Sequence, residues 1–385
     1  MGADSSWIIA RVLTDDAARE SLGVASDFSN LVVLTAQVGH EYAETKRLGE
    51  AHLLPLMASK GVRFVQVARS GKSTRRTKTD PGYVVLSDSR ETRRLFTEGG
   101  GYRLGDEMLG NGTVPQYRAN SRTCSQKFKG IPCDRWLEDE FGETPFVQVM
   151  GFNADEQGRA DRDDSYTGKG RLSRSTRYPL IEWGCGRKEL EAGLAAMFGE
   201  PWAKSCCTFC PFQGTKAGRD GVIERIGRHP EAAAEAMFME RASLALNPRQ
   251  PLFAVQGGCE GFYGQARKDE AKAAFEALEA RLADCEYALY HARRVVYKTA
   301  GGKGGKRDLR ILATGSRRAM ASELGAQAYE RGLRIEEDDR GTLRVWVEHR
   351  DEEALPAREE LLVVAPLTAV EKVGSGFEAM WTEAA

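Results

Sequence analysis

The sequence predicts an α/β protein: a parallel, twisted sheet with flanking helices, then a helical segment and a small C-terminal α+β module. Three observations carry this prediction. Residues 31–35 (Leu-Val-Val-Leu-Thr) form a short continuous apolar run, typical of a strand buried on both faces. A helical stretch over about 42–59 separates this run from a second strand at 62–67. Such alternation favours parallel pairing, because parallel neighbours need a crossover connection.

The chain opens with a predicted helix. Residues 7–13 (Trp-Ile-Ile-Ala-Arg-Val-Leu) are apolar and helical in pattern, and Asp4 or Ser5 would make a good N-cap. Further elements of this domain are expected at 146–151, a later strand of the same sheet, at 179–183, where the chain re-enters the core, and at 188–198, a helix.

Two polar stretches interrupt these elements. Residues 69–123 are glycine-rich, and they contain a basic run with Lys72, Arg75, Arg76 and Lys78. One interpretation of this run is a solvated mobile loop. The other is a lid or arm that contacts phosphates. Residues 155–175 are a second charged stretch, for which we expect a mobile loop.

The second half of the chain is expected to be helical first and mixed afterwards. The predicted elements are helices at 230–246 and 266–282, a strand at 287–299, a flexible turn at 301–306, a strand at 308–314, a helix at 317–331 and a hairpin of 333–336 with 343–347 around 339–341. These elements divide the chain into three predicted parts: an α/β domain at 1–215, a helical segment at 216–285 and an α+β module at 286–385.

Composition sets bounds on function. The chain has 385 residues and a net charge of −1, so no global field attracts it to nucleic acid or membrane. No apolar run approaches the roughly 20 residues that span a bilayer, and no secretory signal is evident. Eight cysteines in such a chain suggest a reducing cytoplasm and metal or redox chemistry.

The densest chemical signal is the stretch 205–212 (Ser-Cys-Cys-Thr-Phe-Cys-Pro-Phe). Cys207 and Cys210 have the spacing that lets two thiolates of one turn face a metal ion or each other. Cys124, Cys133 and Cys185 could supply further ligands. The alternative is that these cysteines are small buried residues that pack as hydrophobes.

A weaker signal lies at the amino terminus. Residues 2–6 (Gly-Ala-Asp-Ser-Ser) have the components of a phosphate-binding turn: a glycine, helix-terminal amides and two hydroxyls. Any helix N-cap has a similar composition.

Taken in order, several short motifs resemble those of the phosphoadenosine-phosphosulfate (PAPS) reductase-like branch of the adenine-nucleotide α-hydrolase-like superfamily, the N-type ATP pyrophosphatases. Residues 2–6 resemble the second half of that family's Ser-Gly-Gly-x-Asp-Ser turn. The other segments that carry the resemblance are 40–45 (His-Glu-Tyr-Ala-Glu-Thr), 124–129 (Cys-Ser-Gln-Lys-Phe-Lys), 151–156 with Arg159, 178–183 (Tyr-Pro-Leu-Ile-Glu-Trp) and 207–212. The resemblance ends by about residue 285.

The resemblance implies an adenine nucleotide, ATP or a PAPS-type compound, at the carboxyl edge of the sheet. The catalytic residues it implies are Asp4, Arg159 and Cys207, and the nucleotide-binding residues are Gly2, Asp4, Ser5, Ser6, His40, Glu41, Lys129 and Arg177. His40 could equally hydrogen-bond locally, and Arg159 and Arg177 could be solvated. Asp155 and Glu156 suit either Mg²⁺ or a turn cap.

The same resemblance implies a [4Fe–4S] cluster on Cys124, Cys206, Cys207 and Cys210, with Cys133 as an alternative to Cys206. A zinc site with these ligands is the structural alternative. A third hypothesis makes one cysteine a persulfide carrier, because a neighbouring Lys or Arg activates a thiolate.

Two departures from the family pattern stand out. The strand and the Ser-Gly that precede the turn in the family are absent, which a start upstream of Met1 or impaired nucleotide binding would explain. The C-terminal Cys-Gly-Leu-His-like segment of true PAPS reductases is also absent, which counts against simple sulfonucleotide reduction.

Three functional hypotheses follow. The first is a cytoplasmic ATP pyrophosphatase-type sulfurtransferase that adenylates an acceptor, with a sulfur donor as partner and a nucleic acid among the acceptors considered. The second is a PAPS or adenylylsulfate reductase that uses a thioredoxin-like reductant. The third is a metal-stapled interaction protein with a degenerate nucleotide fold. None of the three involves a membrane.

Overall fold

The computed structural model describes residues 1–116, 123–164, 172–202, 205–214, 219–253, 258–266, 268–300 and 302–384. The chain forms two compact units. The first unit comprises residues 1–105 and 120–208, and the second comprises 106–119 and 209–385. The second unit thus includes residues 106–119, which the prediction assigned to the α/β domain, together with the expected helical segment and α+β module.

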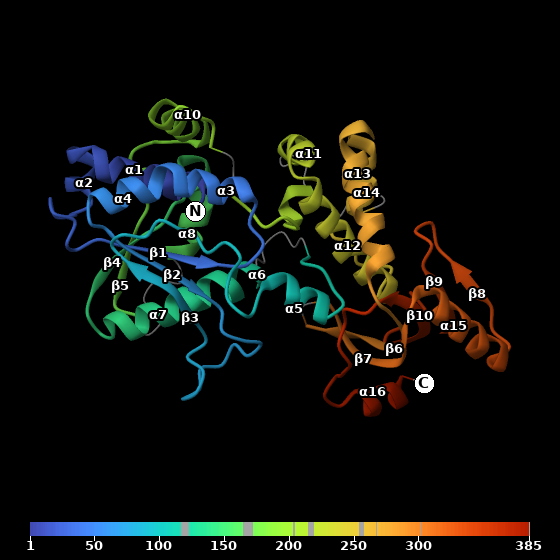
Figure 1. Ribbon diagram of the computed structural model, residues 1–385. Helices are drawn as coiled ribbons and strands as arrows, with labels where there is room; N and C mark the ends of the chain where they lie inside the picture. The colour runs from blue at the N-terminus through green and yellow to red at the C-terminus, as the bar shows by residue number, and fades with distance from the viewer. Residues whose placement is uncertain are drawn as a thin grey trace. The chain divides into compact units, whose positions relative to one another are not determined.

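The first unit contains the predicted parallel strand pair. Strand β1 (Val32–Gln37) pairs in parallel with β2 (Arg63–Ala68), with Val32 opposite Arg63 (Figure 1). Strand β3 (Val84–Ser89) adds to β2 in the antiparallel direction. The expectation for residues 69–123 was a polar, glycine-rich stretch, and it included no strand. Strand β3 forms by pairing with the edge of β2, a non-local interaction that periodicity does not report.

The expected later strand is present, but it belongs to a different sheet. Strand β4 (Phe146–Val149) pairs in parallel with β5 (Arg174–Arg177) in a separate two-stranded sheet. The prediction that residues 146–151 join the sheet of β1 and β2 is therefore wrong. Val147 and Val149 are exposed, because alternate side chains of β4 lie on one face of the strand and that face is largely uncovered.

Helices cover both faces of the β1–β2–β3 sheet. The helix predicted at 42–59 is continuous, with a π-helical turn in its middle. The helices of this unit are α1 (Ala3–Thr14), α2 (Asp16–Ser21), α3 (Ala43–Leu48), η1 (Gly49–Leu53), α4 (Leu54–Ser59), α6 (Thr123–Ser125), η2 (Gln126–Gly130), α7 (Ile131–Phe141), η3 (Ala154–Glu156), α8 (Gln157–Asp164), α9 (Pro179–Glu182) and α10 (Arg187–Phe198).

Helix α8 occupies the start of the stretch that was predicted to be a loop over 155–175, so that prediction is wrong for these residues. Residues 165–171 of the same stretch lie outside the described ranges. The misassignment has a local cause. Six of the eight residues of α8 are charged or polar, and only Ala160 is buried. The stretch therefore lacks the 3.6-residue apolar periodicity by which a helix is predicted from sequence.

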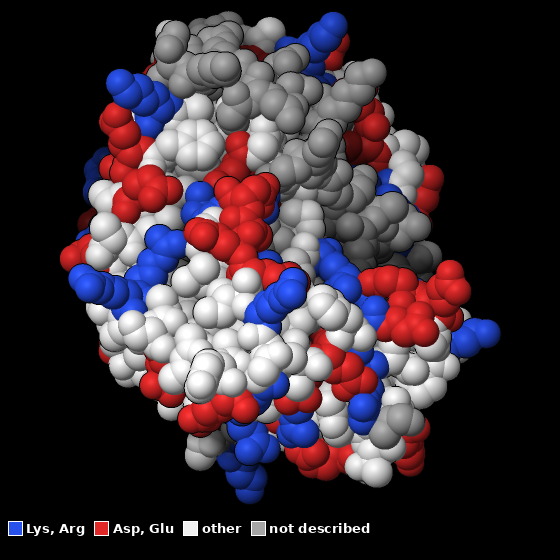
Figure 2. Space-filling view, turned by 90° about the vertical axis from the view of Figure 1, so that its right-hand side faces the viewer, with Lys and Arg blue, Asp and Glu red and all other residues white. Residues whose placement is uncertain are grey.

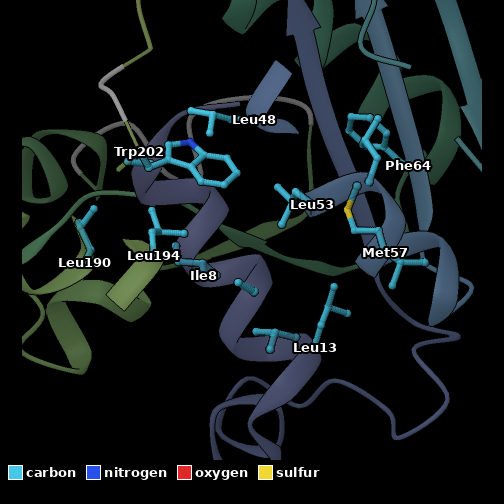
Figure 3. Packing of buried hydrophobic residues seen from close by; sticks show 14 of the residues in the cluster. Ile8, Leu13, Leu48, Leu53, Met57, Phe64, Leu190, Leu194 and Trp202 are labelled. Carbon is cyan, nitrogen blue, oxygen red and sulfur yellow. The ribbon is translucent and has the colours of Figure 1, made fainter. Parts of the chain in front are cut away.

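The main core of the first unit packs around α1. Figure 3 shows Ile8 and Leu13 of α1 facing Leu53 and Met57, with Leu190 and Leu194 of α10 on the other side. On the opposite face of the sheet, α7 contributes Trp136 and Leu137, which pack against β2. The unit is therefore a helix–sheet–helix sandwich, as the alternation of apolar segments predicts.

The second unit is built on one antiparallel sheet with the strand order β11-β7-β6-β10-β9-β8. Its strands are β6 (Tyr287–Thr299), β7 (Gly302–Gly315), β8 (Ile335–Glu337), β9 (Leu343–Glu348), β10 (Ala357–Pro366) and β11 (Lys372–Val373). Its helices are η4 (Pro211–Gly214), α11 (Arg219–Arg228), α12 (Pro230–Leu246), α13 (Gly258–Ala266), α14 (Lys268–Asp284), α15 (Arg317–Arg331) and α16 (Phe377–Glu383), and α5 (Leu104–Gly110) begins at the boundary of the two units.

Several predictions for this half are confirmed, among them the helices at 230–246 and 317–331, the strand at 287–299 and the hairpin of β8 with β9. The flexible turn predicted at 301–306 is wrong from Gly302 onward, because β7 begins there and pairs with β6. Residue 301 lies outside the described ranges. None of the described helices combines the length and the apolar character that crossing a bilayer requires.

Candidate functional site

The predicted phosphate-binding turn is the first turn of α1. Gly2 is the N-cap residue with extended backbone angles, and no side chain caps the helix. The Ser5 hydroxyl donates to the Gly2 carbonyl oxygen at 3.1 Å. The Ser6 hydroxyl is fully buried and makes no hydrogen bond to any described residue. The amino end of α1 therefore retains uncapped amides and one unsatisfied hydroxyl, which suits an anion.

Asp4 in this turn is held by two side chains. Its carboxylate accepts from Asn153 Nδ2 at 2.8 Å and pairs with Arg187 Nη1 at 2.9 Å. Gly151 allows a close backbone approach, since a Cβ there would lie 3.2 Å from the Ser5 nitrogen. Asp4 thus positions Arg187 beside the turn. Sequence reasoning missed Arg187. The available signal was a basic residue at the first position of the helix 187–198, just after Gly184 and Gly186.

The carboxyl end of β1 brings three more predicted residues together. Glu41 forms an isolated antiparallel bridge with Cys207, and the Thr208 amide donates to the His40 carbonyl oxygen at 2.9 Å. Lys129 Nζ lies 3.2 Å from a Glu41 carboxylate oxygen. Glu41 is nearly buried, with 7% of its side chain exposed, whereas Lys129 is 42% exposed. The ammonium of Lys129 is therefore accessible beside a cysteine-bearing segment.

Two further interactions join this group to the α1 turn. A Cβ at Gly2 would lie 2.8 Å from the Ser205 hydroxyl oxygen, so the turn packs directly on the segment that leads to the cysteines. The amino group of Met1 interacts electrostatically with Glu41 and Lys129, and burial lowers the pKa of this group below its ordinary value. The structure therefore assembles the turn, Glu41, Lys129 and Cys207 within one unit.

His40 makes a local contact. Its Nδ1 accepts from the Gly105 amide at 3.3 Å, and the ring lies so close that a Cβ at Gly105 would be 2.4 Å from Nε2. This arrangement fits the local hydrogen-bonding role that the sequence left open.

The two predicted arginines are engaged elsewhere. Arg159 pairs with Glu156, and its guanidinium lies 4.3 Å from the centre of the Phe152 ring. Arg177 pairs with Glu182 and donates to the Ser21 carbonyl oxygen at 2.7 Å, and the hydrogen bonds to Glu182 raise the pKa of Arg177. Both guanidinium groups thus pair with carboxylates outside the α1 turn, so the role predicted for them gains no support from their described partners.

The predicted cluster site on the cysteines is not seen among the described residues. None of the eight forms a disulfide, and the described residues contain no group of three or more His, Cys, Asp or Glu side chains that could hold a metal ion. Burial raises the pKa of the alternative ligand Cys133 to about 12. The described residues therefore give no support to the predicted iron–sulfur or zinc site, and we derive no chemistry from either.

A pocket of about 250 Å³ lies in the second unit, lined by three arginines, two carboxylates and an apolar floor. Arg241, one of the arginines, is bound to both oxygens of Glu260 at 2.6 and 2.8 Å. Another, Arg340, pairs with Asp339 and Glu260. The charges of this pocket are thus largely balanced internally, and it contains none of the predicted site residues.

Comparison with known proteins gives no family for this chain: no family model, no curated protein and no solved structure matches it.

Proposed function

We propose that the first unit is a nucleotide-dependent sulfur-transfer enzyme, which activates an acceptor by adenylation and then replaces the activated oxygen with sulfur. The bridge between Glu41 and Cys207 carries this proposal. It holds a thiol at the carboxyl end of a parallel strand, where open α/β sheets bind their ligands. The thiol-bearing segment also packs on the uncapped turn of α1.

The charges of the site suit a nucleotide phosphate chain. The amides of the α1 turn would bind phosphate oxygens with help from the helix dipole. Lys129 would neutralise part of the phosphate charge, because its ammonium is accessible beside Glu41. Asp4 would act as a positioning residue for Arg187.

The proposed chemistry has two stages. An acceptor oxygen attacks the α-phosphorus of ATP, the α–β phosphoanhydride bond breaks, and pyrophosphate leaves. Cys207, charged with a sulfane sulfur by a persulfide donor, then delivers that sulfur to the activated carbon as AMP leaves, and a thiol reductant cleaves the remaining sulfur–sulfur bond. A lysine beside the thiol would favour the thiolate that such chemistry needs, and Lys129 is connected to the Cys207 segment through Glu41.

The test measures nucleotide binding and pyrophosphate release separately. ATP should raise the melting temperature of the full chain, by an amount equivalent to about 2.7 kcal/mol at a hundredfold excess over Kd. The variant Lys129→Ala should need at least ten times more ATP for the same rise in melting temperature. The variant Cys207→Ser should still release pyrophosphate. It should no longer transfer ³⁵S from labelled glutathione persulfide to the acceptor molecules in the reaction.

Two variants serve as controls. Lys60→Ala removes an exposed lysine at the amino end of β2, away from the proposed site. Cys285→Ser changes a cysteine of the second unit. Both should behave like the unmodified chain. ATP turnover that yields phosphate and no pyrophosphate would contradict the proposal. Sulfite release from a sulfonucleotide would support the reductase alternative instead.

A further inference from the structure

We infer that the loop between β2 and β3 is a phosphate-contacting surface, and that the acceptor of the proposed reaction is a nucleic-acid strand held by Lys72, Arg75 and Lys78. The part of this inference that concerns the acceptor rests on the proposed function. The part that concerns binding rests on the loop alone. The loop extends beyond the sheet in Figure 1.

The loop carries a concentrated positive charge. Residues 69–80 contain five basic side chains and a single carboxylate, that of Asp80. Residues 72–79 are all exposed. Elsewhere the charges are mixed: on the face shown in Figure 2, acidic and basic side chains are interspersed. The near-zero net charge of the chain therefore conceals a local cationic surface.

Intramolecular partners account for the other charges of the loop. Asp80 is bound at the loop base, where its carboxylate accepts from the Ser70 hydroxyl and, at 2.8 Å, from the Gly82 amide. Arg76 pairs with Glu138 and Asp139 of α7. Lys72, Arg75 and Lys78 make no ion pair with any described residue. These three exposed cations are available to an external polyanion.

The loop is also held in shape before any partner binds. The buried Arg69 donates to the Lys72 carbonyl oxygen, the Thr77 amide donates to the Asp80 carbonyl oxygen at 2.9 Å, and the Arg75 amide donates to the Ser73 hydroxyl at 3.0 Å. A pre-organised loop loses less conformational entropy on binding. The hydroxyls of residues 73, 74, 77 and 79 add donors of the kind that contact phosphate oxygens.

The position of the loop connects it to the candidate site. Strands β1 and β2 are parallel, so the loop that follows β2 and the Glu41 segment that follows β1 emerge at the same edge of the sheet. The Arg69 guanidinium lies 4.6 Å from the centre of the Phe128 ring, and the next residue, Lys129, pairs with Glu41. The loop base is thus connected to the Glu41 segment through Arg69, Phe128 and Lys129, whereas Arg76 ties the middle of the loop to the carboxyl end of α7.

A nucleic acid fits this surface better than an acidic peptide does. Residues 72–79 carry only basic and hydroxyl side chains, and none of them is aromatic or apolar. Such side chains suit the repeating phosphodiester backbone of a nucleic acid. Binding should therefore be independent of base sequence and strongly dependent on salt.

The test is fluorescence anisotropy of the full chain with a short labelled oligonucleotide, as a single strand and as a duplex, without ATP. Three phosphate contacts contribute a slope of about −2 for a single strand, or about −3 for a duplex, to log K against log salt. From about 50 to 200 mM salt this corresponds to about 20-fold and 40-fold losses of affinity. In the variant K72A/R75A/K78A, the slope of log K against log salt should become shallower by about 2 for the single strand and about 3 for the duplex.

The matched control is K60A/R93A/K188A, which removes three exposed cations of the same unit outside the loop. It should keep the full slope, and both variants should keep their melting temperatures. An unchanged slope in the loop variant, or an equal loss in the control, would overturn the inference. So would displacement of the oligonucleotide by polyglutamate as readily as by unlabelled nucleic acid of equal charge.

Pyrophosphate release separates the two proposals. If the oligonucleotide stimulates release by the unmodified chain but not by the loop variant, the acceptor assignment is supported. If release occurs but is indifferent to the oligonucleotide and to the loop variant, the acceptor assignment fails while the proposed function stands. If the oligonucleotide binds through the loop and no pyrophosphate forms, the proposed function fails and the binding surface stands.

Discussion

Glu240 offers the sharpest test of how the second unit is held together. This residue of α12 is fully buried. Its carboxylate accepts from the Leu252 amide at 2.7 Å and from the Cys259 amide at 2.9 Å. Gly258 adopts a left-handed conformation there, and a Cβ at this position would lie 2.4 Å from the Glu240 oxygen. One carboxylate therefore anchors both the residues after α12 and the start of α13.

Glu240→Ala leaves two buried amides without an acceptor. Each unsatisfied donor costs about 1–3 kcal/mol, so the expected loss of stability is about 2–6 kcal/mol. Glu240→Gln retains an acceptor oxygen of similar shape and should cost much less. The assay is hydrogen exchange by mass spectrometry at Leu252 and over α13, which reports this region separately from the first unit. Unchanged exchange in the alanine variant, or an equal acceleration in the glutamine variant, would refute the reasoning.

The same side chain predicts a pH dependence. Burial outweighs the donated hydrogen bonds and raises the pKa of Glu240 above its ordinary value of 4.5. Between 4.5 and the folded pKa, the folded chain binds more protons than the unfolded chain. The stability of the second unit should therefore fall as pH rises through this window, by at most about 1.4 kcal/mol per pH unit. Glu240→Gln should remove that contribution.

Two further predictions concern the first unit. Leu194→Ala truncates a fully buried side chain of α10 in the core around α1, and it should destabilise the unit by about 2–5 kcal/mol in denaturant unfolding; a cost below about 1 kcal/mol would contradict the packing described. Cys133 should resist iodoacetamide in the native chain at pH 8, because a thiol with a pKa of about 12 is ionised to only about 1 part in 10,000 at that pH. Mass spectrometry with the denatured chain as the control checks this, and equally fast alkylation in both states would count against the burial of the thiol.

Some of the candidate site was open to prediction and some was not. The α1 turn, Glu41, Lys129 and Cys207 were predicted from short motifs, and they do lie together. The ion-pair partner of Asp4 was not predicted, because Arg187 lies far from Asp4 in the sequence and in no motif. The cysteine spacing suggested a metal site, yet spacing alone cannot decide whether distant cysteines converge on it.

The sequence by itself determined the elements whose signals are local. The helix Pro230–Leu246 has proline in its first turn and good helix formers after it, and the apolar runs of β1 and β2 are separated by a helix long enough for parallel pairing. Tertiary structure alone decided what depends on a distant partner. Strand β3 exists because the edge of β2 accepts it, and β4 pairs with β5 rather than with β1. Backbone hydrogen bonds between strands join residues far apart in the chain, so the neighbour that a strand finds is settled only when the whole unit packs.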